Sequence, residues 1–513
     1  MRILAASDRA LLVEASDLDE AMRLNLAFSA APGVIERIPG ARTVLVRFDP
    51  LQTSAAELAA VLAATEADAS QVPHTREVTI AVRYDGEDLV ETAELLGVSA
   101  DELISRHLAA KWQVAFSGFA PGFGYIVSND PLFDVPRRAS PRTRVPAGAV
   151  ALAGQFTGVY PRESPGGWQL IGQTDAVMWD TDRDPPALLS PGTRVRFERA
   201  SRQFEVLPVG VPRPSTGSVV EDSAVVEIVM RSLQLLVQDA GRAGYAALGV
   251  AASGVADRTA MRDANRAVGN ELEAAVLESA GAAVLRFHGD GVAAVTGAMG
   301  ELTVTDASGL VRGAPHGAPF ATFDGDELQL GYPSHGLRYV IGVRGGFAAA
   351  SALGSRSSDT LAGLGPAPLV AGDVVPIGAT PSRAVDPVVA VRSLPASGDL
   401  VELEITLGPR DDWFTASALE NLLTQEWTVT PRSDRIGMRL HGQVPLERAV
   451  QGELPSEGAV TGAIQVPPDG QPVLFLADHP LTGGYPIIGA LTDRFLDLAA
   501  QLPPGVRIRF RAG

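Results

Sequence analysis

The chain of 513 residues contains no cysteine and only one lysine. The lack of cysteine excludes disulfide bonds, thiolate catalysis and cysteine-ligated zinc. The single lysine, Lys111, lies in HLAAKWQVAF, which is neither a Walker A loop nor an attachment site for biotin or a lipoyl group. We therefore expect no P-loop in this chain and no biotin attached to it.

Long apolar runs and an excess of basic charge are also missing. No apolar run approaches the roughly 20 residues of a membrane-spanning helix. The start, MRILAASDRALLVEASD, carries charge early and lacks a signal-like apolar core. With 42 basic and 60 acidic residues, the formal net charge is −18, which argues against general binding to nucleic acid or anionic membranes. These absences predict a cytoplasmic protein with no nucleic-acid or membrane partner.

Patterned histidine and nucleophile motifs are absent as well. The seven histidines show no HxH or HExxH spacing, and no GxSxG motif has triad partners. We therefore predict no metal site. Asp478 and His479 could form an acid–base pair only within a turn, because adjacent side chains on a strand point to opposite faces.

The apolar fraction of 46% and the charged fraction of 20% are ordinary for soluble globular proteins, and the length favours several domains. Residues 1–77 read as a small α/β domain. RALLVEA and RTVLVRFDP have strand composition, whereas LDEAMRLNLAFSA and AAELAAVLAATEA have helical apolar spacing.

Residues 78–205 form the next expected unit. It opens with the strand VTIAVRYDG and continues with two short helices, the second capped by Ser99. WQVAFSGF and PGTRVRFERA are further strands. Residues 206–223 are rich in proline, serine and glycine and are the best candidate linker.

Two more units are expected, over residues 224–385 and 386–513. Short β-patterns separated by turn signals predict barrels or sandwiches there, with one amphipathic helix, ADRTAMRDANRAVGN, ending near Gly269. Similar phrases, LSPGTRVRF, LVAGDVVPI and LPPGVRIRF, precede a break or the end of the chain. This recurrence favours three related β domains over chance similarity.

The most informative block covers residues 116–172, where glycine, proline, arginine and aromatic residues are dense. Glycine and proline together fix an irregular path of the kind that holds many binding surfaces. Two readings are open, a pocket for a small anion or a tightly turned barrel corner with solvated arginines. The side chains of interest are Phe123, Tyr125, Arg138, Arg142, Tyr160, Trp168 and Gln169.

Three further segments combine polar side chains with glycine-rich turns. They are VQDAGRAGYAALGVAASGVADRTAMRDANRAVGN, LGSRSSDTLAGLG, and the C-terminal set GPRDDWF, TPRSDRIGMRL and SEGAVTGAIQVPPDGQPVLFLADHPLTGGYPIIG. Arginine suits bidentate recognition of carboxylate or phosphate. Each segment could also be a surface loop or a packed helix with exposed ion pairs.

These phrases carry a family resemblance. Residues 1 to about 205 resemble the KipI-like family, also called allophanate hydrolase subunit 1 or the B subunit of 5-oxoprolinase, through GFAPGFGY, PRRASPRTRVPAGAVALAG and TGVYPRESPGGWQLIG. Residues from about 225 to 512 resemble the KipA-like family, also called allophanate hydrolase subunit 2 or the C subunit of 5-oxoprolinase, a biotin-dependent carboxyltransferase family. The carrying phrases there are QDAGRAGY, GSRSSD, SDRIGMRL and DHPLTGGYP.

The resemblance implies a mainly β fold with α+β character: a small N-terminal α/β domain followed by three cyclophilin-like β-barrels in tandem. It implies a fused B/C component of an ATP-dependent 5-oxoprolinase, which opens 5-oxoproline to glutamate with a LamB/YcsF-type partner. Alternatives are the carboxyltransferase component of a urea carboxylase served by a separate biotin carrier, or a Kip-type regulator of a histidine kinase. Whether the chain forms a homo-oligomer is left open.

One departure from the family pattern stands out. Where KipI-like proteins usually read AGGQTGIYP, this chain reads AGQFTGVYP, so Gln155 and Phe156 replace the usual Gly-Gln pair. For ATP, with its magnesium, and for the amide substrate, we predict two sets of residues. The acid–base set is Asp239, Asp434 and Asp478; the binding set adds, to the residues of the 116–172 block, Gln238, Arg242, Arg356, Arg435, Gln465 and Tyr485.

Overall fold

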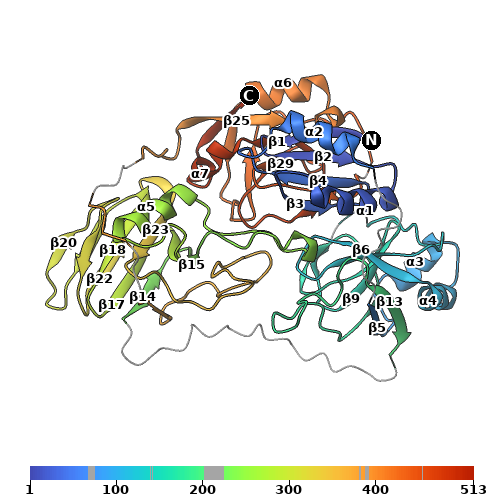
Figure 1. Ribbon diagram of the computed structural model, residues 1–513, viewed down its shortest axis with the longest axis horizontal. Coiled ribbons are helices and arrows are strands. Elements are labelled where there is room, and N and C mark those ends of the chain that lie inside the picture. The colour runs from blue at the N-terminus through green and yellow to red at the C-terminus, as the bar shows by residue number, and fades with distance from the viewer. Residues whose placement is uncertain are drawn as a thin grey trace.

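The structure is a computed structural model that describes residues 1–66, 76–138, 140, 142–200, 224–379, 383–387, 392–452 and 454–513. The chain is mainly β, with barrel-like sheets and few helices (Figure 1), as the sequence predicts. The linker expected over residues 206–223 lies outside the described residues, and the domain boundaries remain predictions. No helix among the described ranges is long and apolar enough to cross a membrane.

The N-terminal unit is a four-stranded antiparallel sheet in the order β1-β2-β4-β3. Asp17 caps the first helix by accepting the Glu20 amide, and Ser54 and Glu57 form a capping box at the second. The elements are β1 (Arg2–Ser7), β2 (Ala10–Glu14), α1 (Leu18–Ala27), η1 (Phe28–Ala30), β3 (Val34–Pro39), β4 (Thr43–Phe48) and α2 (Ala55–Ala64).

Both faces of this sheet are buried. Alternate residues of a strand point to opposite faces: Val44 and Val46 of β4 pack with α1 and α2, whereas Leu45 between them packs on C-terminal residues such as Phe475 and Ile487. Figure 1 shows the blue N-terminal strands beside the orange and red C-terminal strands. The first and last parts of the chain therefore share one core.

The rest of the first half is a seven-stranded sheet, β12-β9-β10-β7-β6-β13-β5, with a two-stranded β11-β8 ribbon. Ser99 caps the second helix, as predicted, by accepting the Glu102 amide. The elements are β5 (Glu77–Val82), α3 (Leu89–Leu95), α4 (Ala100–Ala109), β6 (Trp112–Ser117), β7 (Gly124–Val127), β8 (Arg142–Val145), β9 (Ala149–Ala153), β10 (Phe156–Val159), β11 (Ser164–Gly166), β12 (Gln169–Gln173) and β13 (Arg194–Arg199).

The second half begins with a six-stranded and a five-stranded sheet that share one apolar core. The predicted amphipathic helix is α5, capped by Asp257 and ended by Gly269 in the left-handed conformation. The elements are β14 (Val225–Arg231), β15 (Gln234–Gln238), η2 (Ala246–Leu248), α5 (Arg258–Val268), β16 (Val276–Ala280), β17 (Ala283–His288), β18 (Gly291–Met299), β19 (Leu302–Thr305), β20 (Val311–Gly313), β21 (Phe320–Thr322), β22 (Glu327–Leu330), β23 (His335–Val343) and β24 (Val374–Pro376).

The C-terminal unit is a closed barrel in the order β25-β32-β29-β30-β27-β26-β33, with a small β28-β31 ribbon. Its interior is filled by side chains such as Leu403, Trp427 and Ile508. The elements are β25 (Leu400–Leu407), η3 (Asp411–Trp413), α6 (Ala416–Thr424), β26 (Trp427–Val429), β27 (Gly437–His441), β28 (Glu457–Gly458), β29 (Ala463–Gln465), β30 (Val473–Phe475), β31 (Thr482–Gly483), β32 (Ile487–Leu491), η4 (Asp493–Phe495), α7 (Leu496–Ala499) and β33 (Arg507–Ala512).

The three similar closing phrases form the strands β13, β24 and β33. β13 and β33 occupy equivalent positions, because each pairs in parallel with its unit's first strand and antiparallel with a strand that begins with tryptophan. β24 differs, since it runs antiparallel to β14. The repeated phrase thus corresponds to a shared local topology in two units and to a variant of it in the third.

Candidate functional site

The glycine-rich motif loops of both halves meet between the units. The Gly122 amide donates to the Leu248 carbonyl at 3.1 Å, and the Phe119 amide donates to Thr482 Oγ1 at 3.0 Å. Gly249 has φ of +78°, and a Cβ there would lie 2.6 Å from the Ala120 carbonyl oxygen, so only glycine allows this approach. Motifs far apart in the sequence therefore form one junction.

The loop over residues 352–365 is the centre of this junction, and Asp239 at the end of β15 holds it in place. The Asp239 carboxylate accepts hydrogen bonds from Ser355 Oγ, Ser357 Oγ and the Arg356 amide, each at 2.6 Å. With the Gly241 amide as a further donor, both carboxylate oxygens are occupied within the chain. Asp239 thus orients the loop.

Arg435 links two buried carboxylates from different units. Its Nε and Nη2 donate to the two oxygens of Asp478 at 3.1 and 3.0 Å, and its Nη1 donates to Glu278 of β16. Arg435 and Asp478 are 1% and 0% exposed. Burial alone would raise the pKa of Asp478, but the charge and hydrogen bonds of Arg435 hold it below its usual value.

Asp478 also binds the 352–365 loop. Thr360 donates to Asp478 Oδ2 through its hydroxyl at 2.7 Å and its amide at 3.0 Å, and Ser253 Oγ donates to Oδ1 at 2.6 Å. A single carboxylate therefore connects three loops, those carrying Ser253, Thr360 and Arg435. The neighbouring His479 bonds the Pro480 carbonyl and stacks on Phe475, so the two residues do not form a relay.

Asp359 is a buried carboxyl group of this cluster with a raised pKa. Burial, and then the charge of Asp478, raise the pKa of Asp359 to about 7, and the Leu361 and Ala362 amides donate to its Oδ1. A carboxyl group that titrates near neutral pH suits general acid–base chemistry. Asp359 belongs to the LGSRSSDTLAGLG segment but is not among the predicted acid–base residues.

Arg242 lies beside Asp359 and is 2% exposed. Its Nε donates to the Ala352 carbonyl at 3.3 Å and its Nη2 donates to the Ser357 carbonyl, but its buried Nη1 has no partner. Burial lowers its pKa, and the charges of Asp359, Asp239 and Asp478 oppose this shift. Gln238 joins the same loop by donating to the Ser358 carbonyl at 2.8 Å.

Four other residues predicted from the sequence of the second half, Arg356, Asp434, Gln465 and Tyr485, make contacts of their own. Arg356 is exposed and its Nε donates to the Ala349 carbonyl at 2.9 Å. Asp434 is exposed and stabilises a turn by accepting the Ile436 and Gly437 amides. Gln465 donates to the Tyr485 carbonyl at 3.3 Å, and Arg448 lies over the Tyr485 ring.

In the first half, the predicted aromatic wall is part of the core. Phe123, Tyr125, Tyr160 and Trp168 are buried, with edge-to-face contacts between ring centroids 5.2 to 5.6 Å apart. Gln169 is also buried and donates to the Pro136 carbonyl. This geometry supports the barrel-corner interpretation for these rings.

The two predicted arginines of this block are held by one buried carboxylate. Arg138 Nη1 donates to Asp88 Oδ1 at 2.7 Å, and Arg142 contacts both Asp88 oxygens at 2.7 and 2.9 Å. Burial acts to raise the pKa of Asp88, but the hydrogen bonds from Arg142 and the Leu170 amide lower it. Both guanidinium groups are thus already partly neutralised.

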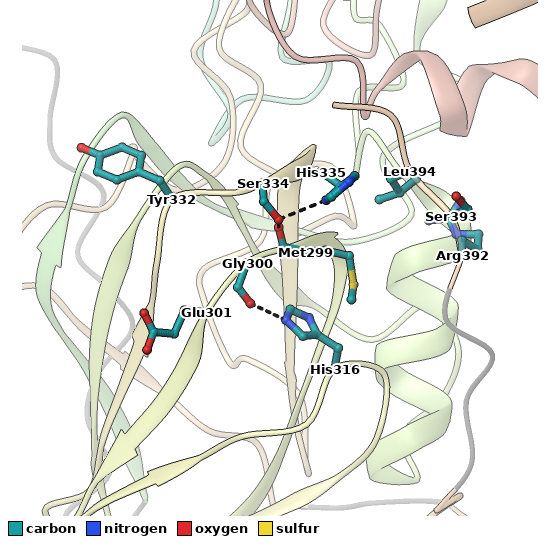
Figure 2. Close-up of a pocket in the computed structure, with 10 residues that line it drawn as sticks. All are labelled: Met299, Gly300, Glu301, His316, Tyr332, Ser334, His335, Arg392, Ser393 and Leu394. Carbon is teal, nitrogen blue, oxygen red and sulfur yellow. Dashed lines mark hydrogen bonds between the residues drawn. The ribbon is translucent and has the colours of Figure 1, made fainter. Parts of the chain in front are cut away.

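Cavities lie outside the junction, and two of them contain residues of interest. One of about 430 Å³ lies at the edge of the five-stranded sheet, where His316 donates to the Gly300 carbonyl at 2.7 Å and Tyr332 and Arg392 lie on opposite sides (Figure 2). The other, of about 490 Å³, is lined by Gln155 and Phe156 together with residues of the N-terminal and C-terminal units. The departure from the family motif therefore lines a cavity where three units meet.

Among the residues predicted from the sequence, the structure brings together Gln238, Asp239, Arg242, Arg356, Arg435 and Asp478. Asp359, Glu278, Ser253 and Thr360 lie with them but were not predicted as site residues. A glutamate in the centre of VLESA is a detectable signal, because a charge in a buried strand needs a partner. Ser253 and Thr360 offered no such signal. Within the described ranges, no three histidine, aspartate or glutamate side chains form a group that could hold a metal ion.

Each half of the chain matches a known protein family. The family described as carboxyltransferase domain, subdomain C and D, matches residues 1–189, and subdomain A and B matches residues 248–512. The B subunit of 5-oxoprolinase from Escherichia coli O157:H7 is 40% identical over 32% of this chain and 78% of its own length. The C subunit of 5-oxoprolinase from Escherichia coli K12 is 32% identical over 56% of this chain and 90% of its own length.

The chain is also similar to a urea amidolyase and to a protein of known structure. A urea amidolyase of Lachancea kluyveri is 29% identical over 55% of this chain, which is 17% of its own length. The solved structure of TTHA0988 covers 98% of this chain and 99% of its own at 34% identity, with a TM-score of 0.82. The tandem order of the two halves thus has a counterpart of known structure.

Proposed function

We propose, from the premise that the chain belongs to the carboxyltransferase-domain family as a fusion of its C/D and A/B subdomains, that it is the fused B and C component of an ATP-dependent 5-oxoprolinase. The observation that carries the proposal is the junction in which motif loops of both halves surround Asp359 and Arg242. The finer fold assignment, three cyclophilin-like barrels, belongs to the same proposal.

The reaction would open the lactam of 5-oxoproline. ATP transfers its γ-phosphoryl group to the amide oxygen and leaves as ADP; water then adds to the activated carbon, the C–N bond breaks, and phosphate and glutamate are released. Opening is unfavourable without ATP. Asp359, whose raised pKa of about 7 leaves it partly protonated at neutral pH, would give a proton to the departing nitrogen.

Guanidinium groups would hold the phosphoryl group and the charge that develops in the transition state. Arg242 fits this role because its Nη1 is buried without a partner. Arg435 instead fixes Asp478 and Glu278. A LamB/YcsF-type partner would supply the remaining machinery, which agrees with the names of the relatives as subunits.

The direct test is glutamate release from 5-oxoproline and ATP, measured with the purified chain alone, with a LamB/YcsF-type partner, and with the partner alone. We expect turnover only in the combination. Asp359→Asn should lower kcat about 100-fold or more, whereas Asp306→Asn, which alters a distant turn, should not. No turnover in any combination would refute the proposal.

A second candidate is the carboxyltransferase component of a urea carboxylase, favoured by the similarity to urea amidolyase. It requires a biotin carrier on another chain, because the one lysine here lies in no carrier motif. Carboxylation of urea on addition of a biotinylated carrier protein, with no glutamate release from 5-oxoproline, would select this candidate.

A further inference from the structure

Arg162, from the first half of the chain, reaches the 352–365 loop of the second half. Its Nη1 lies 2.7 Å from the position that a Cβ on Gly363 would occupy. Gly363 has φ of +65°, so the absence of a side chain both permits this backbone turn and leaves room for the guanidinium group. The contact therefore joins the TGVYPRESPGG motif to the LGSRSSDTLAGLG segment.

Arg162 is half-buried and lacks a counter-ion. Within the described residues it takes part in no hydrogen bond and no ion pair, and its Nε is fully buried. Burial lowers its pKa, and only the more distant charge of Asp359 opposes this shift. Leaving a guanidinium group in this state is costly unless a ligand pairs with it.

Arg242 is the second unpaired cation beside the same loop. Its Nη2 lies 3.2 Å from the position of a Cβ on Gly365, two residues beyond the Arg162 contact, and its partners are two neutral carbonyl groups. It forms no ion pair with a described residue, and its Nη1 is buried and unpartnered. Two guanidinium groups, one from each half, thus flank one short segment.

We propose that Arg162 and Arg242 together form an oxyanion site that is complete only when both halves of the chain are present. The site takes a group with two or more negatively charged oxygens, either the carboxylate of the amide substrate or a phosphoryl group. Guanidinium forks match both groups geometrically. Arg162 was not among the residues predicted from the sequence. The inference rests on the proposed function for the identity of the substrate, and it adds a binding site to that function.

The site also responds to pH through Asp359. This carboxyl group is faced by Asp478, Arg242 and Arg435 and by Arg162. A bound anion adds negative charge next to Asp359 and favours its protonated form, so binding takes up a proton. Affinity for the anion should therefore fall as pH rises through about 7, where Asp359 ionises.

The site distinguishes between substrate classes. A carboxylate-bearing lactam such as 5-oxoproline offers the required group, whereas urea is neutral and offers none. Calorimetric titration of the full chain with 5-oxoproline, with the neutral lactam 2-pyrrolidinone, and with inorganic phosphate tests this directly. We expect binding of 5-oxoproline or of phosphate, and no binding of 2-pyrrolidinone; the anion that binds identifies the source of the oxyanion.

Substitutions of Arg162 and Arg242 test whether these two residues bind the anion. Arg162→Gln and Arg242→Gln should each weaken anion binding about tenfold or more, and Arg162→Lys should retain part of it. Arg144→Gln is the matched control, because Arg144 is an exposed arginine of the same block whose one ion pair among the described residues is with Glu163. Asp359→Asn should remove the pH dependence of 5-oxoproline binding, because the carboxylate of that ligand stays ionised near pH 7.

The results of these experiments test the oxyanion site and the proposed function independently. Binding of neither anion, or binding that is unchanged in Arg162→Gln, would overturn the site. Anion binding that depends on Arg162 without glutamate release in the presence of the partner would leave the site standing and refute the 5-oxoprolinase assignment. If Arg162→Gln releases glutamate with an unchanged KM for 5-oxoproline and for ATP, the 5-oxoprolinase assignment stands and the oxyanion site is refuted.

Discussion

At the scale of single residues, the junction depends on buried charges that neutralise one another. Arg435 lies between Asp478 and Glu278, which come from different units, and all three side chains are at most 3% exposed. Removing one partner of such a set leaves a buried charge uncompensated, which costs more than the pair itself contributes. Arg435 is therefore a structural residue of the junction.

Replacing Arg435 by alanine should lower the free energy of unfolding by about 3–5 kcal/mol. Arg439, an exposed residue of the strand β27 that follows, provides the control. Arg439→Ala should change the free energy of unfolding by less than about 0.5 kcal/mol. Urea unfolding followed by tryptophan fluorescence measures both. Equal midpoints for the two variants would show that the buried network contributes little.

His107 gives the protein a second titrating group with a predictable effect. It is 0% exposed, and its ring nitrogens contact Tyr84 Oη at 2.8 Å and Thr157 Oγ1 at 3.1 Å. Burial lowers the pKa of His107 to about 3. The unfolded chain therefore binds a proton below about pH 6.5 that the folded chain does not.

It follows that acid destabilises the fold through His107. Between pH 6.5 and pH 3 the free energy of unfolding should fall by about 1.4 kcal/mol per pH unit for this group. His107→Gln should lose about 2 kcal/mol less than the wild type between pH 7 and pH 5. Parallel stability–pH curves for the two proteins would contradict this assignment.

At the scale of elements, the helices of the first half and α5 were predictable because their signals are local, whereas α6 and α7 were not predicted. Ser99 and Gly269 act at helix ends as the sequence indicates, whereas the capping role of Asp257 was not predicted. β1 and β3 were not predicted, because each mixes charged and apolar residues and is stabilised by its neighbours. The 352–365 loop was recognised by composition, but its role as a hub depends on Asp239, which lies over 100 residues away.

The loop should therefore loosen when Asp239 is removed. Asp239→Ala should speed hydrogen exchange of the Arg356 amide by about 5- to 150-fold, since the variant lacks a charged acceptor worth about 1–3 kcal/mol. Asp306→Ala removes a comparable set of hydrogen bonds from a different turn and is the control. Unchanged exchange at Arg356 would mean that Ser355 and Ser357 hold the loop without Asp239.

At the scale of the whole molecule, the first and last units form one body. Arg410 of the C-terminal unit pairs with Glu457 and with Glu14 of β2, and the Ala41 amide donates to the Ser456 carbonyl at 2.7 Å. The sequence could not show this contact, because both faces of an apolar strand look alike. The apolar runs ALLVE and TVLVRF predict burial on two faces but not the partner.

The two halves should remain together without a covalent connection. Chains 1–200 and 224–513, coexpressed, should copurify in equal amounts, because the N-terminal sheet packs on the C-terminal barrel. Gly458→Val should prevent this, since its Cβ would lie 2.7 Å from Leu45 Cβ. Gly313→Val adds a side chain in open space and is the control; separation of the unaltered halves would contradict the shared core.

The shared core of the first and last units also bears on biosynthesis. The face of the N-terminal sheet that carries Leu45 is covered by Ala246 and Ala251 and, mainly, by residues from about position 459 onward. At a synthesis rate of about 5–20 residues per second, that face emerges from the ribosome about 20–80 s before the C-terminal part of its cover exists. Until then the nascent chain presents an apolar sheet surface, so we expect chaperone demand to be concentrated on the earliest part of this protein.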